Sequence, residues 1–323
     1  MFTLLTRVAT LLCLIVVGFG AYVRLSDAGL GCPDWPGCYG KLTPTAASSD
    51  IAQAAKAMPE GPVSMPKAWK EMIHRYLAGI LGALIAIMMV MAWLGRRPRG
   101  IGAVFPTMLA ALVIVQALFG KWTVTLLLKP AIVTGHLLGG MIIFASLCWL
   151  MVSCNNGSQR RESPASLKLF ALLALLLLFA QIALGGWVST NYAALACTDF
   201  PTCHGAWVPS QTDFEHGFTM ARELGKNAVG DNLSREALTT IHWVHRVGAL
   251  VVGAFLCLFA WALVQQGTWR MHGLVLFFLL CTQIGLGIAN VLLSLPLVLA
   301  VAHNVVAALL LGKLVMINHR IRH

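Results

Sequence analysis

The sequence has little charge. Asp, Glu, Lys and Arg make up 11% of its 323 residues, whereas a soluble domain averages about 25%. Acidic residues are the scarcest, with 12 Asp and Glu against 23 Lys and Arg, and nine cysteines are too few for a disulfide scaffold. Hydrophobic residues make up 58% of the chain. This composition excludes an ordinary water-soluble enzyme and a disordered chain, and it predicts an integral membrane protein.

Eight stretches are long and apolar enough to cross a membrane. A spanning helix needs about 20 mostly apolar residues to cross a hydrocarbon layer of about 30 Å. The qualifying stretches lie near 5–24, 71–94, 102–125, 131–152, 167–189, 239–264, 271–293 and 298–317. We therefore expect an all-helical membrane protein with both termini on one side.

Basic residues gather in the short segments on the side of the termini. They are Arg7, Arg96, Arg97, Arg99, Arg160, Arg161, Lys168, Arg270, Lys313, Arg320 and Arg322, with Glu162 as the only acid among them. The other eleven acids fall in or beside two long segments near 25–70 and 190–238. This is the positive-inside pattern, so it predicts cytoplasmic termini and gives no sign of a nucleic-acid surface. The absence of an Arg- and Ser-rich leader favours a bacterial plasma (inner) membrane.

The sequence contains an internal repeat. A first set of residues recurs 165 positions later, and the matched pairs are Gly20 with Gly185, Val23 with Val188, Cys32 with Cys197, Pro36 with Pro201, Cys38 with Cys203 and Gly40 with Gly205. Further along, His74-Arg75 matches His245-Arg246, and Gln116, Gly120 and His136 match Gln283, Gly287 and His303. The repeat predicts two tandem four-helix bundles, 1–155 and 156–323, related by a pseudo-two-fold axis along the membrane normal.

Four repeat-matched histidines are the strongest functional signal. They are His74, His136, His245 and His303, and each is expected a turn or two from the outer surface, on a helix that runs inward. A single intramembrane histidine can be a simple helix contact, but ionisable residues at matched depth usually mark function. Two imidazoles on facing helices of one bundle can hold a haem between them. The remaining histidines, His204, His216, His272, His319 and His323, are expected to be solvated.

Four further residues lie close to the histidines in the sequence. Arg75 and Arg246 could bind carboxylates such as haem propionates, or extend to lipid headgroups. Glu71 lies one turn before His74, and His242 occupies the matching place in the second half. A haem that is to be chemically changed needs a proton-handling group, which Glu71 could be, although it could also be a helix-terminal charge paired with Arg75. His242 could be a second ligand, but a partner for a propionate or for Glu236 is favoured.

The outer segments carry two Cys-x5-Cys pairs, Cys32 with Cys38 and Cys197 with Cys203. Disulfides persist in an oxidising compartment, so each pair could staple a loop, or it could be a labile redox pair or link transiently to a substrate. The spacing does not decide between these. The other five cysteines, Cys13, Cys148, Cys154, Cys257 and Cys281, are expected to be small core residues.

Taken together, these segments resemble the haem A synthase family. The resemblance rests on Glu71-Met-Ile-His74-Arg75, Thr134-Gly-His136, Val244-His245-Arg246, His303 and Cys32-Pro-Asp-Trp-Pro-Gly-Cys38. It implies an oxidoreductase that converts a methyl group of haem O to the formyl group of haem A. It also implies a bound haem b with axial ligands His245 and His303, and a haem O site between His74 and His136 with Glu71 beside it.

The resemblance also implies partners. Haem O would be delivered by a haem O synthase, electrons would come from a donor that the sequence does not identify, and a homo-oligomer is compatible with the chain.

Two rival functions share part of the pattern. A di-haem b-type cytochrome would use all four histidines as an electron carrier, and a membrane thiol oxidoreductase would use the outer cysteine pairs. A transporter built from parallel repeats fits the architecture, but the sequence shows no broken pair of helices of the kind that forms a substrate site in transporters.

Overall fold

The regular structure in the described part of the chain is helical. The computed structural model describes residues 1–98, 100–154 and 164–322. Eight of its helices are long and apolar enough to cross a membrane. They are α1 (Phe2–Leu25), α3 (Met65–Trp93), α4 (Val104–Thr125), α5 (Pro130–Cys154), α6 (Ala165–Thr190), α8 (Arg235–Gln265), α9 (Arg270–Leu292) and α10 (Leu297–Arg322). The predicted all-helical fold with eight spans is confirmed.

The helices that carry Glu71 and His245 begin earlier than the apolar pattern predicts. Ser64 precedes α3, and its hydroxyl accepts a hydrogen bond from the N–H of Lys67 at 3.5 Å. Ser234 caps α8 in the same way, with a hydrogen bond of 3.1 Å from Ala237. Serine at this position satisfies one of the free N–H groups of the first turn. Polar first turns therefore extend both helices beyond their apolar segments.

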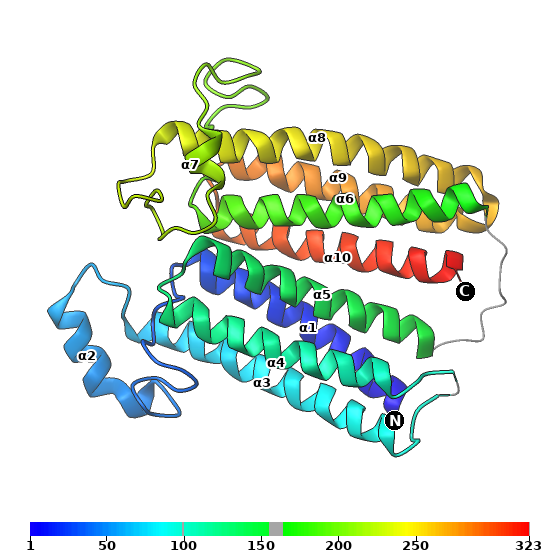
Figure 1. The fold of residues 1–323 in the computed structure, drawn as a ribbon, viewed down its shortest axis with the longest axis horizontal. Coiled ribbons are helices and arrows are strands. Elements are labelled where there is room, and N and C mark those ends of the chain that lie inside the picture. Colours follow the sequence, from blue (N-terminus) through cyan, green and yellow to red (C-terminus); the bar gives the residue numbers. More distant parts are fainter. Residues whose placement is uncertain (99, 155–163, 323) are drawn as a thin grey trace.

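The spanning helices contact one another in two sets of four. α1, α3, α4 and α5 pack together, as do α6, α8, α9 and α10, and the sets meet where α1 and α5 contact α10 and α5 contacts α6 (Figure 1). The apolar core runs through this interface and includes Phe144, Leu147, Leu311 and Leu314. This pattern is consistent with the predicted tandem bundles, although the proposed boundary between 155 and 156 lies outside the described residues.

The two ends of the molecule differ in charge. Both termini lie at one end, which we call the terminal end, and the long loops with the short helices α2 (Ser48–Ala57) and α7 (Phe214–Phe218) lie at the other, the loop end (Figure 1). The predicted basic cluster belongs to the terminal end, but Arg99, Arg160, Arg161 and Glu162 lie outside the described residues. The short helix α2 was not predicted, and Ile51 anchors it in a small core with Cys32 and Cys38.

Two expectations about single residues are wrong. His319 is not solvated but buried, with its Nε2 2.8 Å from the Ser153 hydroxyl and its ring edge-on to Trp149. The neighbouring Asn318 is buried as well and donates to the Ala171 carbonyl at 2.8 Å. These contacts explain why α10 continues beyond the predicted end at 317. Cys281 is exposed on α9 rather than part of the core, whereas Cys13 and Cys148 are buried as expected.

Candidate functional site

Each long loop is closed by a disulfide at the loop end. The pairs Cys32–Cys38 and Cys197–Cys203 are both bonded, so the predicted pairings are confirmed. The first loop then turns back, with the N–H of Cys38 donating to the Lys41 carbonyl at 2.9 Å. The second turns in the same way, from Cys203 to Ala206. The repeat in sequence is therefore also a repeat in loop structure.

An aspartate holds the turn in each loop. In the first, the carboxylate of Asp34 accepts from the N–H groups of Tyr39 and Gly40 at 2.6 and 2.7 Å. In the second, Asp199 accepts from the N–H groups of His204 and Gly205 at 2.7 and 2.9 Å. The residues that donate have positive φ angles of 52° to 77°, and the carboxylate satisfies the N–H groups that this backbone presents together.

The loop of Asp199 should be insensitive to mild acid. The hydroxyl of Thr202 and the N–H groups of Gly205 and His204 hold the pKa of Asp199 well below its usual 3.8. A lowered pKa means that the carboxylate stabilises the loop above pH 3.8 and loses this effect only as the pH falls below it. Pulsed hydrogen exchange of the loop peptide is therefore expected to show full protection near pH 5 and loss of protection in stronger acid.

An asparagine in place of Asp199 supplies the comparison, because the amide does not ionise. Asp199→Asn should weaken protection of the loop at every pH and remove most of its acid dependence, while Asp231→Asn in the neighbouring exposed segment should leave the profile unchanged. An acid profile that is the same in the wild type and Asp199→Asn would show that another group controls the loop.

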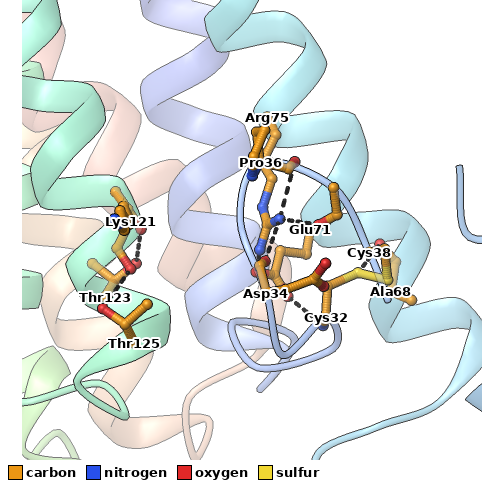
Figure 2. Close-up of polar contacts among 12 residues, drawn as sticks. Cys32, Asp34, Pro36, Cys38, Ala68, Glu71, Arg75, Lys121, Thr123 and Thr125 are labelled. Atoms are coloured by element: carbon orange, nitrogen blue, oxygen red, sulfur yellow. Dashed lines mark hydrogen bonds and ion pairs between the residues drawn. A yellow bond between two sulfur atoms is a disulfide. The ribbon is translucent and has the colours of Figure 1, made fainter. Parts of the chain in front are cut away.

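Glu71 and Arg75 fasten the first disulfide loop to α3. Glu71, 5% exposed, accepts from the N–H of Cys32 at 2.9 Å, and its other carboxylate oxygen pairs with Arg75 at 2.5 Å. Arg75 also donates to the carbonyls of Asp34, Pro36 and Gly37 at 2.8, 3.2 and 2.5 Å. Figure 2 shows the loop wrapped over these two side chains. The expected pairing of Glu71 with Arg75 is present.

His242 and Arg246 do the same for the second loop. The N–H of Cys197 points to Nδ1 of His242 at 3.1 Å, and Nε of Arg246 lies 3.2 Å from Nε2 of the same ring. Arg246 donates to the carbonyls of Cys197, Asp199 and Thr202, each at 2.8 Å. Of the two partners favoured for His242, Glu236 contacts neither ring nitrogen, and contact with a propionate stays a prediction. Because a neutral imidazole has one acceptor nitrogen, His242 can satisfy only one of the two donors that Glu71 satisfies together.

Arg75 and Arg246 thus each donate several hydrogen bonds to loop carbonyls. The sequence suggested that Arg75 and Arg246 reach outward to haem carboxylates, and contact with a propionate stays a prediction. What the structure adds is a position for each guanidinium directly between a disulfide loop and the histidine-bearing helix.

The first histidine pair lies between α3 and α5. His74 is nine positions into α3 and His136 six positions into α5, and their ring centroids are 6.5 Å apart with an interplanar angle of 79°. Nδ1 of each ring is buried without a hydrogen-bond partner. Both side chains are nevertheless only half-buried, so part of each ring remains free for a ligand.

The second pair is placed in the same way. His245 is ten positions into α8 and His303 six positions into α10. Both are half-buried, and Nδ1 of His303 is buried without a partner. The four histidines therefore sit at corresponding depths near the loop end of their helices.

A glycine faces each of the four imidazoles. A Cβ atom built on Gly20 would lie 2.9 Å from Cε1 of His74, and one on Gly120 would lie 3.2 Å from Cε1 of His136. In the second half Gly185 faces His245 and Gly287 faces His303, at 3.2 and 3.1 Å. Real Cβ atoms are almost never found below 3.0 Å from another atom. The repeated glycines therefore leave the space in which the rings stand.

Glutamine amides contact three of the four histidines. Gln116 donates to the His136 carbonyl at 2.7 Å, and the Gln283 amide lies 3.2 Å from Nε2 of His303. Gln181 lies 3.0 Å from Nδ1 of His245 and donates to its carbonyl at 2.9 Å. The repeat signalled Gln116 and Gln283, but Gln181 has Val16 as its counterpart, so no repeat pattern pointed to Gln181.

The residues present fit a haem. A metal–imidazole nitrogen bond is about 2.0–2.1 Å long, so two imidazoles sharing one metal ion have ring centres about 6–6.5 Å apart. The separation of His74 and His136 is 6.5 Å. In the described part of the chain no three His, Cys, Asp or Glu side chains gather to hold a metal ion by themselves. A paired-histidine site suits a metal that brings its own equatorial ligands, as haem does.

Comparison with known proteins agrees with this geometry. The family model described as Cytochrome oxidase assembly protein matches residues 3–315. The haem A synthase of Shewanella oneidensis is 39% identical, over 99% of this chain and 97% of its own. Those of Sphingopyxis alaskensis and Chelativorans sp. are 28% and 29% identical, over 96% and 94% of this chain and 89% and 86% of theirs. With four repeated histidines, two stapled loops and eight spans, this chain belongs to the haem A synthase family of cytochrome oxidase assembly proteins.

Proposed function

We propose that the protein is a haem A synthase, an oxidoreductase that oxidises one methyl group of haem O to the formyl group of haem A. Family membership and the paired histidines support a haem substrate. The observation that carries the proposal is the difference between the two halves. Glu71 and His242 occupy matching places beneath matching disulfide loops, yet only the first half has a carboxylate there. One half is thus equipped to handle protons and the other to retain a haem.

The two sites follow from this difference. His74 and His136 in the first bundle, 1–155, would hold the haem O substrate, and His245 and His303 in the second, 156–323, would be the axial ligands of a resident haem b. Arg75 and Arg246 stand at the loop end of each site, where carboxylates of a bound haem would meet them. When bound, haem b supplies one-electron redox chemistry next to the substrate site.

Glu71 would serve the proton steps. Conversion of a methyl to a formyl group removes two hydrogens from the carbon, adds one oxygen and oxidises the carbon. With molecular oxygen as the oxidant, electrons from the donor and protons reduce the remaining oxygen atoms to water, so protons must be handled near the porphyrin edge. The carboxylate of Glu71 is three residues before His74, and the Cys32 N–H and Arg75 hold it in place. A carboxylate fixed in this way would exchange protons beside the bound porphyrin.

The proposal also includes the membrane in which the protein lies, its orientation there and its partners. We place the protein in a bacterial plasma (inner) membrane, with the terminal end in the cytoplasm, because basic residues dominate that end. Haem O would come from a haem O synthase, and electrons from a donor protein or quinol. A homo-oligomer stays a prediction.

Two rival functions differ in what they leave unexplained. A di-haem b-type cytochrome has no task for a buried carboxylate beside one haem only. A membrane thiol oxidoreductase usually relies on a close Cys-x-x-Cys pair, whereas both pairs here are six residues apart in sequence. Extraction of pigments from the purified protein separates the three, since only a synthase should yield haem O or haem A.

The direct test is Glu71→Gln. Glutamine keeps one acceptor oxygen, for the Cys32 N–H or for Arg75, but does not take up a proton. The variant is therefore expected to retain haem, accumulate haem O and lose haem A output by about 100-fold, the lower end of the usual general acid–base effect. The measurement is chromatographic haem analysis of cells that supply haem O. His242→Gln is the matched control in the second half and should keep haem A output within a few-fold. Normal haem A output from Glu71→Gln would remove Glu71 from the mechanism.

A further inference from the structure

A histidine at the terminal end lies between two cations. His272 is the third residue of α9, half-buried, with its ring 5.4 Å from that of the buried Trp269. Nζ of Lys313 lies 3.1 Å from its Nδ1, and a guanidinium nitrogen of Arg320 lies 3.1 Å from its Nε2. The expectation that His272 is merely solvated is therefore wrong. α9 and α10 bring the three side chains together.

This cluster has fewer hydrogen-bond acceptors than its donors require. A neutral imidazole has one acceptor nitrogen and an imidazolium has none, while Lys and Arg only donate. At most one of the two cations can therefore donate to His272 at a time. The ring of His242 faces two donors as well, but there Arg246 has three carbonyl acceptors besides. In the described residues, Lys313 and Arg320 have no acceptor other than His272.

The cluster also lacks a counter-charge. Lys313 is half-buried on a membrane-spanning helix, where an unpaired charge is costly. The ion pairs among the described residues all lie at the loop end, and none involves Lys313 or Arg320. Arg270 and Arg322, both exposed, add positive charge at the same ends of α9 and α10. Arg320 is exposed to solvent, and among the described residues no acidic side chain balances the charge of Lys313 and Arg320.

We propose that His272, Lys313 and Arg320 form a binding site for a phosphate group, and that the headgroup of an anionic phospholipid supplies it. A phosphate oxygen between the two cations provides the missing acceptor and the missing charge together. The position in the fold favours a lipid over a free ion. The three residues lie at the terminal end of the spanning helices, beside a buried tryptophan, and lipid headgroups lie at this level of the membrane. Basic clusters between spanning helices bind acidic headgroups in this way.

The test compares lipids of opposite character on the full-length, haem-loaded protein. Native mass spectrometry of the detergent-purified protein, titrated with phosphatidylglycerol or phosphatidylcholine, should show preferential binding of phosphatidylglycerol. One positive charge near the membrane is worth about fivefold in affinity, so Lys313→Gln and Arg320→Gln should each weaken phosphatidylglycerol binding about fivefold. Arg96→Gln, which removes an exposed charge at the same end, should leave it unchanged. Lys313→Arg keeps the charge and should bind nearly as the wild type does.

Two further arms complete the experiment. Inorganic phosphate that displaces phosphatidylglycerol at equal concentration would identify a free phosphate, not the headgroup, as the occupant and would overturn the lipid assignment. Equal binding of both lipids, or equal phosphatidylglycerol affinity in the wild type and both glutamine variants, would overturn the site itself. Helix content by circular dichroism confirms that each variant is folded, and Lys313→Arg decides the matter if a glutamine variant is not.

Discussion

Alanine in place of His245 or His303 is expected to give a purified protein that has lost the haem b proposed for the second bundle, with haem content reduced by at least about tenfold. Each substitution removes one of two axial ligands, and disturbing even the groups around a metal ligand costs about 10–100-fold in affinity. The side chains that contact the two imidazoles, Gln181 and Gln283, offer only amides in their place. Optical spectra and chromatography of the extracted haem give the measurement.

His242→Ala is the informative comparison. His242 is one turn from His245 but faces Cys197 and Arg246, so its loss should loosen the second disulfide loop and leave the haem bound. Unchanged haem content in His245→Ala and His303→Ala would refute the assignment of the second bundle as the cofactor half. Loss of haem in His242→Ala alone would make that residue the ligand.

Gly20→Ala is expected to abolish haem A formation, by at least about tenfold, although it adds only a methyl group. In a helix, Gly→Ala is normally favourable by about 0.5–1 kcal/mol. Here the new Cβ would lie 2.9 Å from Cε1 of His74, so the ring must turn away from the position in which it faces His136. Positioning within a fraction of an ångström decides whether a ligand pair can share one metal ion.

Gly79→Ala on α3 is the matched control, because a Cβ there meets nothing within 4 Å. It should leave haem A output unchanged and raise the thermal unfolding midpoint slightly. The haem b of the second bundle should remain in Gly20→Ala, since Gly20 lies on α1 and not against His245 or His303. Normal haem A output from Gly20→Ala would mean that the orientation of His74 is not required.

Much of the fold could be predicted because the membrane imposes it. Apolar runs mark the spans, and a repeat at a fixed distance pairs residues such as His136 with His303 before any coordinates are known. The polar first turns of α3 and α8 were missed, since hydropathy does not register a cap such as Ser64. The helix α2 was missed because its stability comes from contacts of Ile51 with the distant Cys32 and Cys38.

The histidines of the candidate site could be picked out from the sequence, whereas the contacts that support the site could not. Histidines stand out in an apolar helix, whereas the partners of Arg75 are backbone carbonyls of a loop about 40 positions away, which carry no sequence signal. Gln181 contacts His245 but has no repeat counterpart. The cluster of His272 with Lys313 and Arg320 depends on how α9 packs against α10. In the sequence, its basic residues were explained as part of the positive-inside pattern, so they gave no sign of a site.

The interface between the two sets of four helices is formed by corresponding helices of the two repeats. α1 contacts α10, its repeat partner α6 contacts α5, and α5 meets α10 directly. Close glycine contacts occur on both sides of this interface, Gly18 of α1 with Val305 of α10 and Gly186 of α6 with Leu137 of α5, although these residues are not repeat counterparts. A face that pairs with its own copy is what a two-fold homodimer uses. Within one chain, the two halves therefore meet through an arrangement of helices like that of a two-fold homodimer.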